Sequence, residues 1–293
     1  MISDISLSHR KEEPESGVLY IVGTPIGNLD DISKRVVNVL KRASLIACED
    51  TRKTKKLLNH LSIKNKLLSF HKYSSGEKCN FFISMLKEGA SIALVSDAGM
   101  PSISDPGNFL IRKAKENNID VICIPGPCAA ITALVSSGID SSRFTFYGFM
   151  PRSTKERNKT LKIINESDAT SIIYESPKRI LKLLNDLKVL IENDREIVVL
   201  KELTKKYEKH FGYEIDSIIK EFEGLDIRGE FTLVIGANKR LNKDEAFIKD
   251  LKEDLNELIK AGLSHSAAAN YLSKKSRKPK NEIYKLILNN ELE

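Results

Sequence analysis

The sequence predicts an α/β protein with two α/β domains followed by a small helical extension. Short apolar runs alternate with amphipathic helical segments between residues 18 and 236, a pattern typical of a mainly parallel sheet flanked by helices. Three of these apolar runs end abruptly in loops rich in Gly and Pro. After Gly236 no strand candidate follows, and the remaining segments have helical periodicity.

In the first half, segments with helical periodicity separate the strand candidates. Asp30 or Asp31 can cap the first helix, and Gly89 ends a later one. A helix over 129–135 completes this half. The strand candidates are 18–22, 44–48, 67–70, 92–95 and 121–124.

A second α/β unit begins near Phe144, after a predicted hinge at Ser141 to Arg143. One of its helices carries Pro177 in the first turn, where proline is well tolerated. Its strand candidates are 144–149, 170–174, 196–200 and 230–235. We therefore expect a disordered tail over 1–16, an N-terminal α/β domain over 17–140, a C-terminal α/β domain over 141–237 and a helical extension over 238–293.

The composition is that of a globular protein, with 41% hydrophobic and 30% charged residues in a chain of 293. No apolar run approaches the roughly 20 residues of a membrane span, and the first residues lack the apolar core of a signal peptide. We expect a cytoplasmic protein without membrane contact. The four cysteines show no metal-ligand spacing, so neither a metal site nor a disulfide framework is predicted.

The net charge of +7 permits a polyanionic partner without requiring one. Ser264 is a candidate N-cap after the Gly262 turn, so the extension resembles a helix-turn-helix unit. Both nucleic-acid contact and simple packing remain open for it. The two basic clusters are Arg52, Lys53, Lys55 and Lys56, and Lys274, Lys275, Arg277, Lys278 and Lys280.

The loop over 95–107 is the most informative feature for function. It follows a buried strand and contains Asp97 among Gly and Pro, which stop a β-ladder because Pro has no N–H donor and Gly favours turns. The loops 23–28 and 125–130 repeat this pattern. Ligands of open α/β sheets bind at the carboxyl edge of the strands. We predict that the three loops converge on one adenosine-containing ligand held largely by main-chain groups, with Asp97 accepting hydrogen bonds.

A second group of loops carries charged side chains at predicted strand ends. These segments are 49–52, 174–179 and 201–208. Adjacent carboxylates and cations at one sheet edge can bind phosphates and remove a proton from a substrate. Each segment by itself also fits an ordinary surface turn.

Together these loops resemble the tetrapyrrole-methylase superfamily, and within it the enzymes that methylate the 2′-hydroxyl of a cytidine in small-subunit ribosomal RNA. The resemblance spans residues 18–236, and the family's helical extension is similar to the chain after Asn238. The matching segments are 22–29, 49–52, 96–107, 125–127, 146–152, 174–177 and 201–205.

The resemblance implies S-adenosylmethionine bound in a cleft between the two domains, small-subunit ribosomal RNA as substrate, and a homodimer. Met100, Cys128 and Lys178 depart from the family's usual Thr, Ser and His, which leaves backbone contacts possible and puts two hydroxyl contacts in question. The residues expected to meet the methyl donor are Pro25, Asp97, Ala98, Gly99, Met100, Gly126, Pro127, Cys128 and Ala129. Those expected to hold RNA are Arg52, Arg152, Lys178 and Arg179.

A ribose hydroxyl is a poor nucleophile, so a general base would contribute about 10²–10⁴-fold to its methylation. The candidates are Glu49, Asp50 and Glu202, with Lys201 placed to stabilise the developing alkoxide. One alternative is a tetrapyrrole or diphthine-type methyltransferase of the same superfamily. The other is a non-enzymatic nucleic-acid-binding protein that uses the extension, which predicts no affinity for S-adenosylmethionine.

Overall fold

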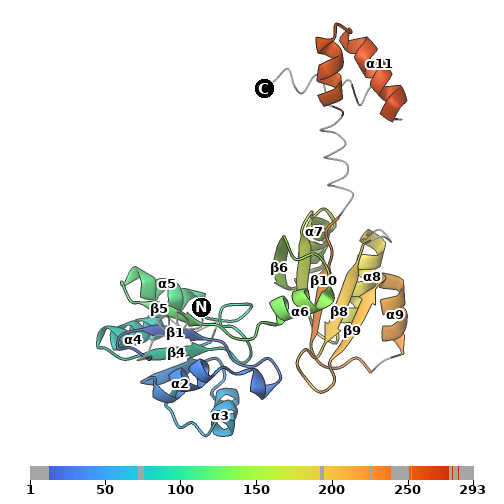
Figure 1. The fold of residues 1–293 in the computed structure, drawn as a ribbon. Coiled ribbons are helices and arrows are strands. Elements are labelled where there is room, and N and C mark those ends of the chain that lie inside the picture. Colours follow the sequence, from blue (N-terminus) through green and yellow to red (C-terminus); the bar gives the residue numbers. More distant parts are fainter. Residues whose placement is uncertain are drawn as a thin grey trace, which may run out of the picture.

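The computed structural model describes residues 13–71, 76–191, 195–224, 226–238, 251, 253–276, 279 and 283. Two α/β lobes lie side by side, and a helical unit carries the C-terminal part of the chain (Figure 1). Within the expected N-terminal tail, Glu13 is buried and its carboxylate accepts two hydrogen bonds of 2.6 Å from Arg35.

The first lobe is built on a five-stranded sheet in the order β3-β2-β4-β1-β5, with every recorded strand pair parallel. Its strands are β1 (Leu19–Val22), β2 (Leu45–Cys48), β3 (Leu67–Ser69), β4 (Ile92–Val95) and β5 (Val121–Ile124). Its helical elements are η2 (Leu29–Asp31), α2 (Lys34–Arg42), α3 (Thr51–His60), α4 (Gly76–Lys87) and α5 (Asn108–Glu116).

Every residue of β1, β2 and β4 is buried, because hydrophobic clusters cover both faces of the sheet. The helix after the first loop differs from the prediction at its start. Ser33 caps α2 by accepting a hydrogen bond of 3.1 Å from the Val36 N–H, whereas Asp30 and Asp31 lie in η2. Gly89 follows α4 with φ +91°, the left-handed conformation that ends helices.

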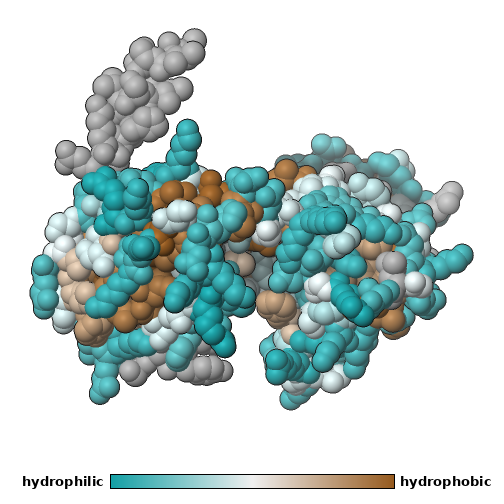
Figure 2. Space-filling model, turned by 90° about the horizontal axis from the view of Figure 1, so that it is seen from below, coloured by the Kyte–Doolittle hydropathy of each residue, from teal (hydrophilic) through white to brown (hydrophobic). Residues whose placement is uncertain are grey.

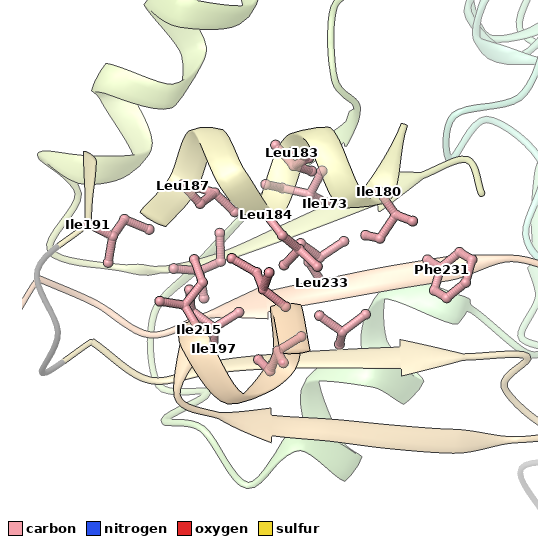
Figure 3. Packing of buried hydrophobic residues seen from close by; sticks show 14 of the residues in the cluster. Ile173, Ile180, Leu183, Leu184, Leu187, Ile191, Ile197, Ile215, Phe231 and Leu233 are labelled. Carbon is pink, nitrogen blue, oxygen red and sulfur yellow. The ribbon is translucent and has the colours of Figure 1, made fainter. Parts of the chain in front are cut away.

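The second lobe contains a mixed sheet in the order β6-β7-β10-β8-β9. Helices α8 and α9 cover one face, where the side chains of Ile173, Leu184 and Leu233 pack together (Figure 3). Its elements are β6 (Phe144–Phe149), α7 (Thr154–Asn165), β7 (Thr170–Glu175), α8 (Ile180–Leu190), β8 (Ile197–Lys201), β9 (Lys209–Tyr213), α9 (Ile215–Glu223) and β10 (Phe231–Ile235).

Strand β9 was not predicted from the sequence. Phe211 is its one buried residue, since β9 is an edge strand paired with β8 alone. A segment that places one side chain in the core carries little hydrophobic periodicity, so the pattern was too weak to detect.

Helix α6 (Ala129–Ser137) joins the two lobes in sequence and covers the second face of the second sheet. Ala130, Ala133 and Leu134 share a buried cluster with Ile172 and Val234 of that sheet. The alternation of strands and helices predicts this helix as part of the first half of the chain, but its small apolar face packs on the second sheet. The domain limits expected from the sequence, 17–140 and 141–237, remain a prediction.

In the extension, α11 (His265–Ser276) packs against the helical segment over 253–260. Ser264 caps α11, as predicted, by accepting a hydrogen bond of 3.3 Å from the Ala267 N–H. Lys275 pairs with Asp254 at 2.8 Å. Arg277, Lys278 and Lys280 of the predicted basic cluster lie outside the described residues. None of the described helices has the length and apolar character needed to cross a membrane.

Candidate active site

The three Gly/Pro loops meet at the carboxyl edge of the first sheet, because β4, β1 and β5 are adjacent strands. Thr24 and Gly99 exchange backbone hydrogen bonds of 2.9 and 3.1 Å, which join the first loop to the second. A Cβ on Gly23 would lie 2.7 Å from the Gly126 Cα, so only glycine allows the first and third loops to approach so closely. The predicted convergence of the three loops is therefore present in the structure.

Asp97 ties the end of β4 to the neighbouring end of β2. Its Oδ1 accepts a hydrogen bond of 3.0 Å from the Asp50 N–H, and its Oδ2 lies 2.9 Å from Lys53 Nζ on α3. The hydrogen bond with Asp97 raises the pKa of Lys53. The Asp97 carboxylate thus holds the ends of β2 and β4 together. A ligand that binds Asp97 would have to share the carboxylate with the Asp50 N–H and with Lys53.

Asp50 has a structural role at the start of α3. Its carboxylate accepts the Arg52 N–H at 2.8 Å as an N-cap and binds the Arg52 guanidinium through contacts of 3.0 and 2.7 Å. These hydrogen bonds from Arg52 hold the pKa of Asp50 well below its usual range. Such a carboxylate is a weak proton acceptor, and it fixes the direction of α3.

Two other carboxyl groups at this edge have raised pKa values. Burial raises the pKa of Glu49, and the charge of Asp97 adds to the effect. Burial also raises the pKa of Asp105 to about 6, with the charges of Glu49 and Asp97 as further causes. A hydrogen bond with Ser96 and the charge of Lys53 oppose the rise. Raised pKa values of this kind suit a base that works near neutral pH.

The second lobe presents a matching edge, because β6, β7 and β8 run in the same direction. Glu175 at the end of β7 and Lys201 at the end of β8 both stand opposite Phe231. Arg179 lies 3.4 Å from the buried Glu175 carboxylate and donates hydrogen bonds of 2.8 and 3.0 Å to the carbonyls of Met150 and Pro151. Arg179 therefore fixes the loop that carries Arg152.

The Glu202 carboxylate accepts its hydrogen bonds from groups of the second lobe. Its Oε1 accepts hydrogen bonds from Lys205 Nζ at 3.0 Å and from the Glu230 N–H at 2.9 Å. Burial alone would raise the pKa of Glu202, but these two hydrogen bonds keep it below the ordinary value. Glu202 is thus better suited to position Lys205 than to remove a proton.

The two edges contact each other between the lobes, where a furrow is visible in Figure 2. The Asn28 N–H of the first lobe donates a hydrogen bond of 3.1 Å to the Thr204 hydroxyl of the second. Within the second lobe, the Tyr174 hydroxyl accepts a hydrogen bond of 2.9 Å from the Ala130 N–H, at the point where the third loop becomes α6. Burial raises the pKa of Tyr174, and the charges of Cys128 and Asp105 contribute. The loop that carries Asp105 reaches the second lobe, since a Cβ on Gly148 of β6 would lie 3.0 Å from the Ser104 hydroxyl oxygen.

Four non-glycine residues in loops at these two edges have positive φ values. Ser102 and Ser104 have φ values of +73° and +63°, and Glu202 and Thr204 have +54° and +65°. A non-glycine residue in this conformation costs about 1–3 kcal/mol and is retained where the surroundings require it, often at active sites.

The structure brings most of the predicted site residues to these two edges. The donor-side residues lie in the three converging loops, with Pro25 and Gly99 buried and Ala98 exposed. Met100 packs on Gly23, since a Cβ there would lie 2.6 Å from the Met100 sulfur. Arg152 and Lys178 are exposed at the second edge.

Two side chains of this region were not among the predicted site residues. Asp105 lies in the 95–107 loop, and Tyr174 lies at the end of β7. The 95–107 loop contains two carboxyl groups, Asp97 and Asp105, and this pair in one predicted binding loop is the sequence signal that would have identified Asp105. The burial that changes its acidity depends on the folded arrangement and has no local sequence pattern.

The fold and the loops define a methyltransferase of a known class. The family model described as Tetrapyrrole (Corrin/Porphyrin) Methylases matches residues 18–218, and the chain belongs to this family. Solved structures similar in fold include the methyltransferase CobJ (TM-score 0.58, 17% identity, 76% of this chain and 95% of that chain) and diphthine synthase (TM-score 0.57, 14% identity, 75% and 90%). At these identities the likeness concerns the fold.

Relatives with much higher identity extend over nearly the whole chain. The protein named Ribosomal RNA small subunit methyltransferase I is 40% identical in Escherichia coli O157:H7, over 96% of this chain and 98% of the relative. Its namesake from Synechocystis sp. is 39% identical over 93% and 98%. The one from Bacillus subtilis is 39% identical over 92% and 94%. The match includes the extension as well as both lobes.

Proposed function

We infer that this chain is an S-adenosylmethionine-dependent methyltransferase that modifies small-subunit (16S) ribosomal RNA. The observation that carries this conclusion is the similarity of about 40% over almost the full length to proteins of that name from distant bacteria. We further propose that the methylated atom is the 2′-oxygen of a cytidine ribose, and that the enzyme acts as a cytoplasmic homodimer.

The three converging loops fit S-adenosylmethionine. Their backbones are joined by hydrogen bonds, and the close Gly23–Gly126 approach leaves a surface of main-chain groups and small side chains such as Ala98. One solved neighbour of the same fold, a uroporphyrin-III C-methyltransferase from Thermus thermophilus, was determined with S-adenosylhomocysteine (TM-score 0.53, 12% identity). When bound, the cofactor supplies an activated methyl group, so the enzyme has to position and desolvate the acceptor.

We propose Asp105 as the general base that takes the proton from the ribose hydroxyl. Its pKa of about 6 leaves it ionised at neutral pH yet more basic than an exposed carboxylate. It interacts with Glu49 of the first lobe and with Tyr174 of the second. Glu49, the predicted base with a raised pKa, then tunes Asp105 and is the alternative acceptor.

The remaining predicted residues serve the substrate and the geometry in this proposal. Asp50 and Glu202 fix α3 and Lys205, while Lys201 faces the developing alkoxide. Arg152 and Lys178 bind phosphates as exposed cations, with Arg52 at the edge of the first lobe. Arg179 holds the Arg152 loop through its carbonyl contacts.

The test is transfer of labelled methyl from S-adenosylmethionine to small ribosomal subunits and to naked 16S RNA from a strain that lacks the enzyme. Nuclease mapping and mass spectrometry then locate the methyl group. We expect label on one ribose, with no transfer to a tetrapyrrole offered as a control substrate. Label on a base, on a protein or on the tetrapyrrole would contradict the proposal.

A further inference from the structure

A basic groove lies beside the candidate active site on the first lobe. It has a volume of about 590 Å³ and runs between one face of α3 and the returning chain that leads into β3. Arg52, Lys55 and Asn59 line it from α3, where spacings of three and four residues place them on one side of the helix. Lys64 lines it from the opposite wall.

The floor of this groove is apolar. Leu58 and Ile63 are buried, Leu67 is half-buried, and all three line the groove. The Ile63 N–H donates a hydrogen bond of 2.8 Å to the Leu58 carbonyl, which fixes the two walls relative to each other. Figure 2 shows this side of the molecule, where hydrophobic side chains on the first lobe lie between long hydrophilic ones.

The charge of the groove has one sign. Its nine lining residues include three cations and no carboxylate. Within the described part of the chain, no ion pair involves Lys55 or Lys64, and both are exposed. Unpaired cations above an apolar floor complement a flexible polyanion whose sugars and bases are partly apolar.

The groove adjoins the candidate active site at the start of α3. Thr51 and Arg52, which line one end, directly follow Glu49 and Asp50 at the end of β2. On the same helix, Lys53 turns the other way and pairs with Asp97. A strand that enters the site can therefore pass along α3, over about 12 Å from Thr51 to Asn59.

We propose that this groove binds the single-stranded RNA that flanks the methylated nucleotide. The inference rests on the proposed function, because it assumes that the substrate is RNA. Lys55 and Lys64 contact phosphates from opposite walls, and the apolar floor receives a ribose or base. The groove sets how the strand approaches the site, so it contributes to substrate affinity and leaves the methyl-transfer chemistry to the residues around Asp105.

The test compares the double variant Lys55→Gln/Lys64→Gln with the single variant Lys56→Gln. Lys56 is an exposed neighbour on the same helix that does not line the groove, so its replacement controls for the loss of one positive charge outside the groove. RNA binding is measured by fluorescence anisotropy at several salt concentrations, and steady-state methylation is measured with the same RNA. Calorimetry with S-adenosylmethionine checks that the cofactor site is intact.

We expect the double variant to raise the Kd and KM for RNA roughly two- to thirtyfold, the effect of two exposed charge contacts. The slope of log K against log salt should fall by about 1.4, since each contact with a single strand contributes about 0.7. The cofactor affinity, and kcat at saturating RNA, should stay unchanged. Lys56→Gln should alter RNA binding less than twofold.

The groove assignment fails if Lys56→Gln weakens RNA binding as much as the double variant does, or if the double variant binds RNA like the wild type. These outcomes differ from a failure of the proposed function, in which the wild-type enzyme transfers no methyl to RNA at all. Acetylation of lysines with and without RNA gives a second measurement. Lys55 and Lys64 should be protected by RNA, and Lys56 should stay reactive.

Discussion

Replacement of Asp105 with Asn should lower activity and raise stability at the same time. The pKa of Asp105 is raised from 3.8 to about 6, a difference of about 2 units. Each unit corresponds to about 1.4 kcal/mol, so the ionised carboxylate costs the folded state at most about 3 kcal/mol relative to the unfolded chain, because solvent still reaches this half-buried group.

The sign of the effect follows from the direction of the shift. Between about pH 4 and pH 6 the unfolded chain releases the Asp105 proton while the folded protein keeps it, so stability falls as pH rises through this range. Above pH 6 the loss is complete. Asp105→Asn removes the titration and should therefore be more stable than the wild type at pH 7.5, by up to about 3 kcal/mol. The gain should shrink as pH falls toward 4.

Urea denaturation of both proteins at pH 4.5, 6 and 7.5 measures this difference. In single-turnover assays the variant should lose about 10²–10⁴-fold in methyl transfer, while RNA and cofactor binding persist. A rate within a few-fold of the wild type would refute the role of Asp105. A variant that is less stable at every pH would refute the account of its buried charge.

The neighbours of Asp105 provide the second half of the test. Glu49 and Asp97 raise its pKa, Lys53 lowers it, and Tyr174 interacts with it from the other lobe. Glu49→Gln removes a charge that raises the pKa of Asp105, so the acidic limb of the pH profile of kcat/KM should move to lower pH. If Glu49→Gln instead lost as much activity as Asp105→Asn, Glu49 would be the base. Surface substitution Glu116→Gln is the control and should leave the limb in place.

Three further predictions concern the scaffold. Tyr174→Phe removes the acceptor of the Ala130 N–H and should lower stability by about 1–3 kcal/mol in urea denaturation, with a matching rise in the mobility of α6 in hydrogen exchange. Gly126→Ala should weaken S-adenosylmethionine binding in calorimetry, because the new Cβ would lie 2.8 Å from the Gly23 Cα; wild-type affinity would contradict the loop geometry. Arg195→Met should destabilise the second lobe by about 2–5 kcal/mol in the same denaturation assay, since three carbonyls lose the hydrogen bonds that this buried guanidinium donates at 2.6–3.1 Å.

Much of the fold could be predicted because strong local patterns specify it. Strands β1, β2 and β4 are buried throughout, and each of them is a continuous apolar run that ends in turn-forming residues. The convergence of the loops followed from topology, since parallel strands end at a common edge. Strand β9, with one buried side chain, lacked such a pattern.

The candidate site was harder to predict, because its chemistry depends on contacts between distant segments. Asp50 and Glu202 look like equal carboxylates in the sequence. In the structure, Asp50 is neutralised by Arg52 two residues away, and Glu202 is held by Lys205 and by the Glu230 N–H. Local motifs located the loops correctly but did not rank the acids within them.

The difference between these carboxylates has one physical origin. A carboxylate that caps a helix or pairs with an exposed guanidinium gains hydrogen bonds that stabilise its charge, so it becomes a weaker base. Asp105 instead loses solvent beside two other acids, and that loss increases its basicity. The first arrangement stabilises the loop edge, while the second destabilises it by up to about 3 kcal/mol at neutral pH. A folded protein retains such a cost where the charge serves a reaction, and the strained backbone of the adjacent Ser104 lies in the same loop.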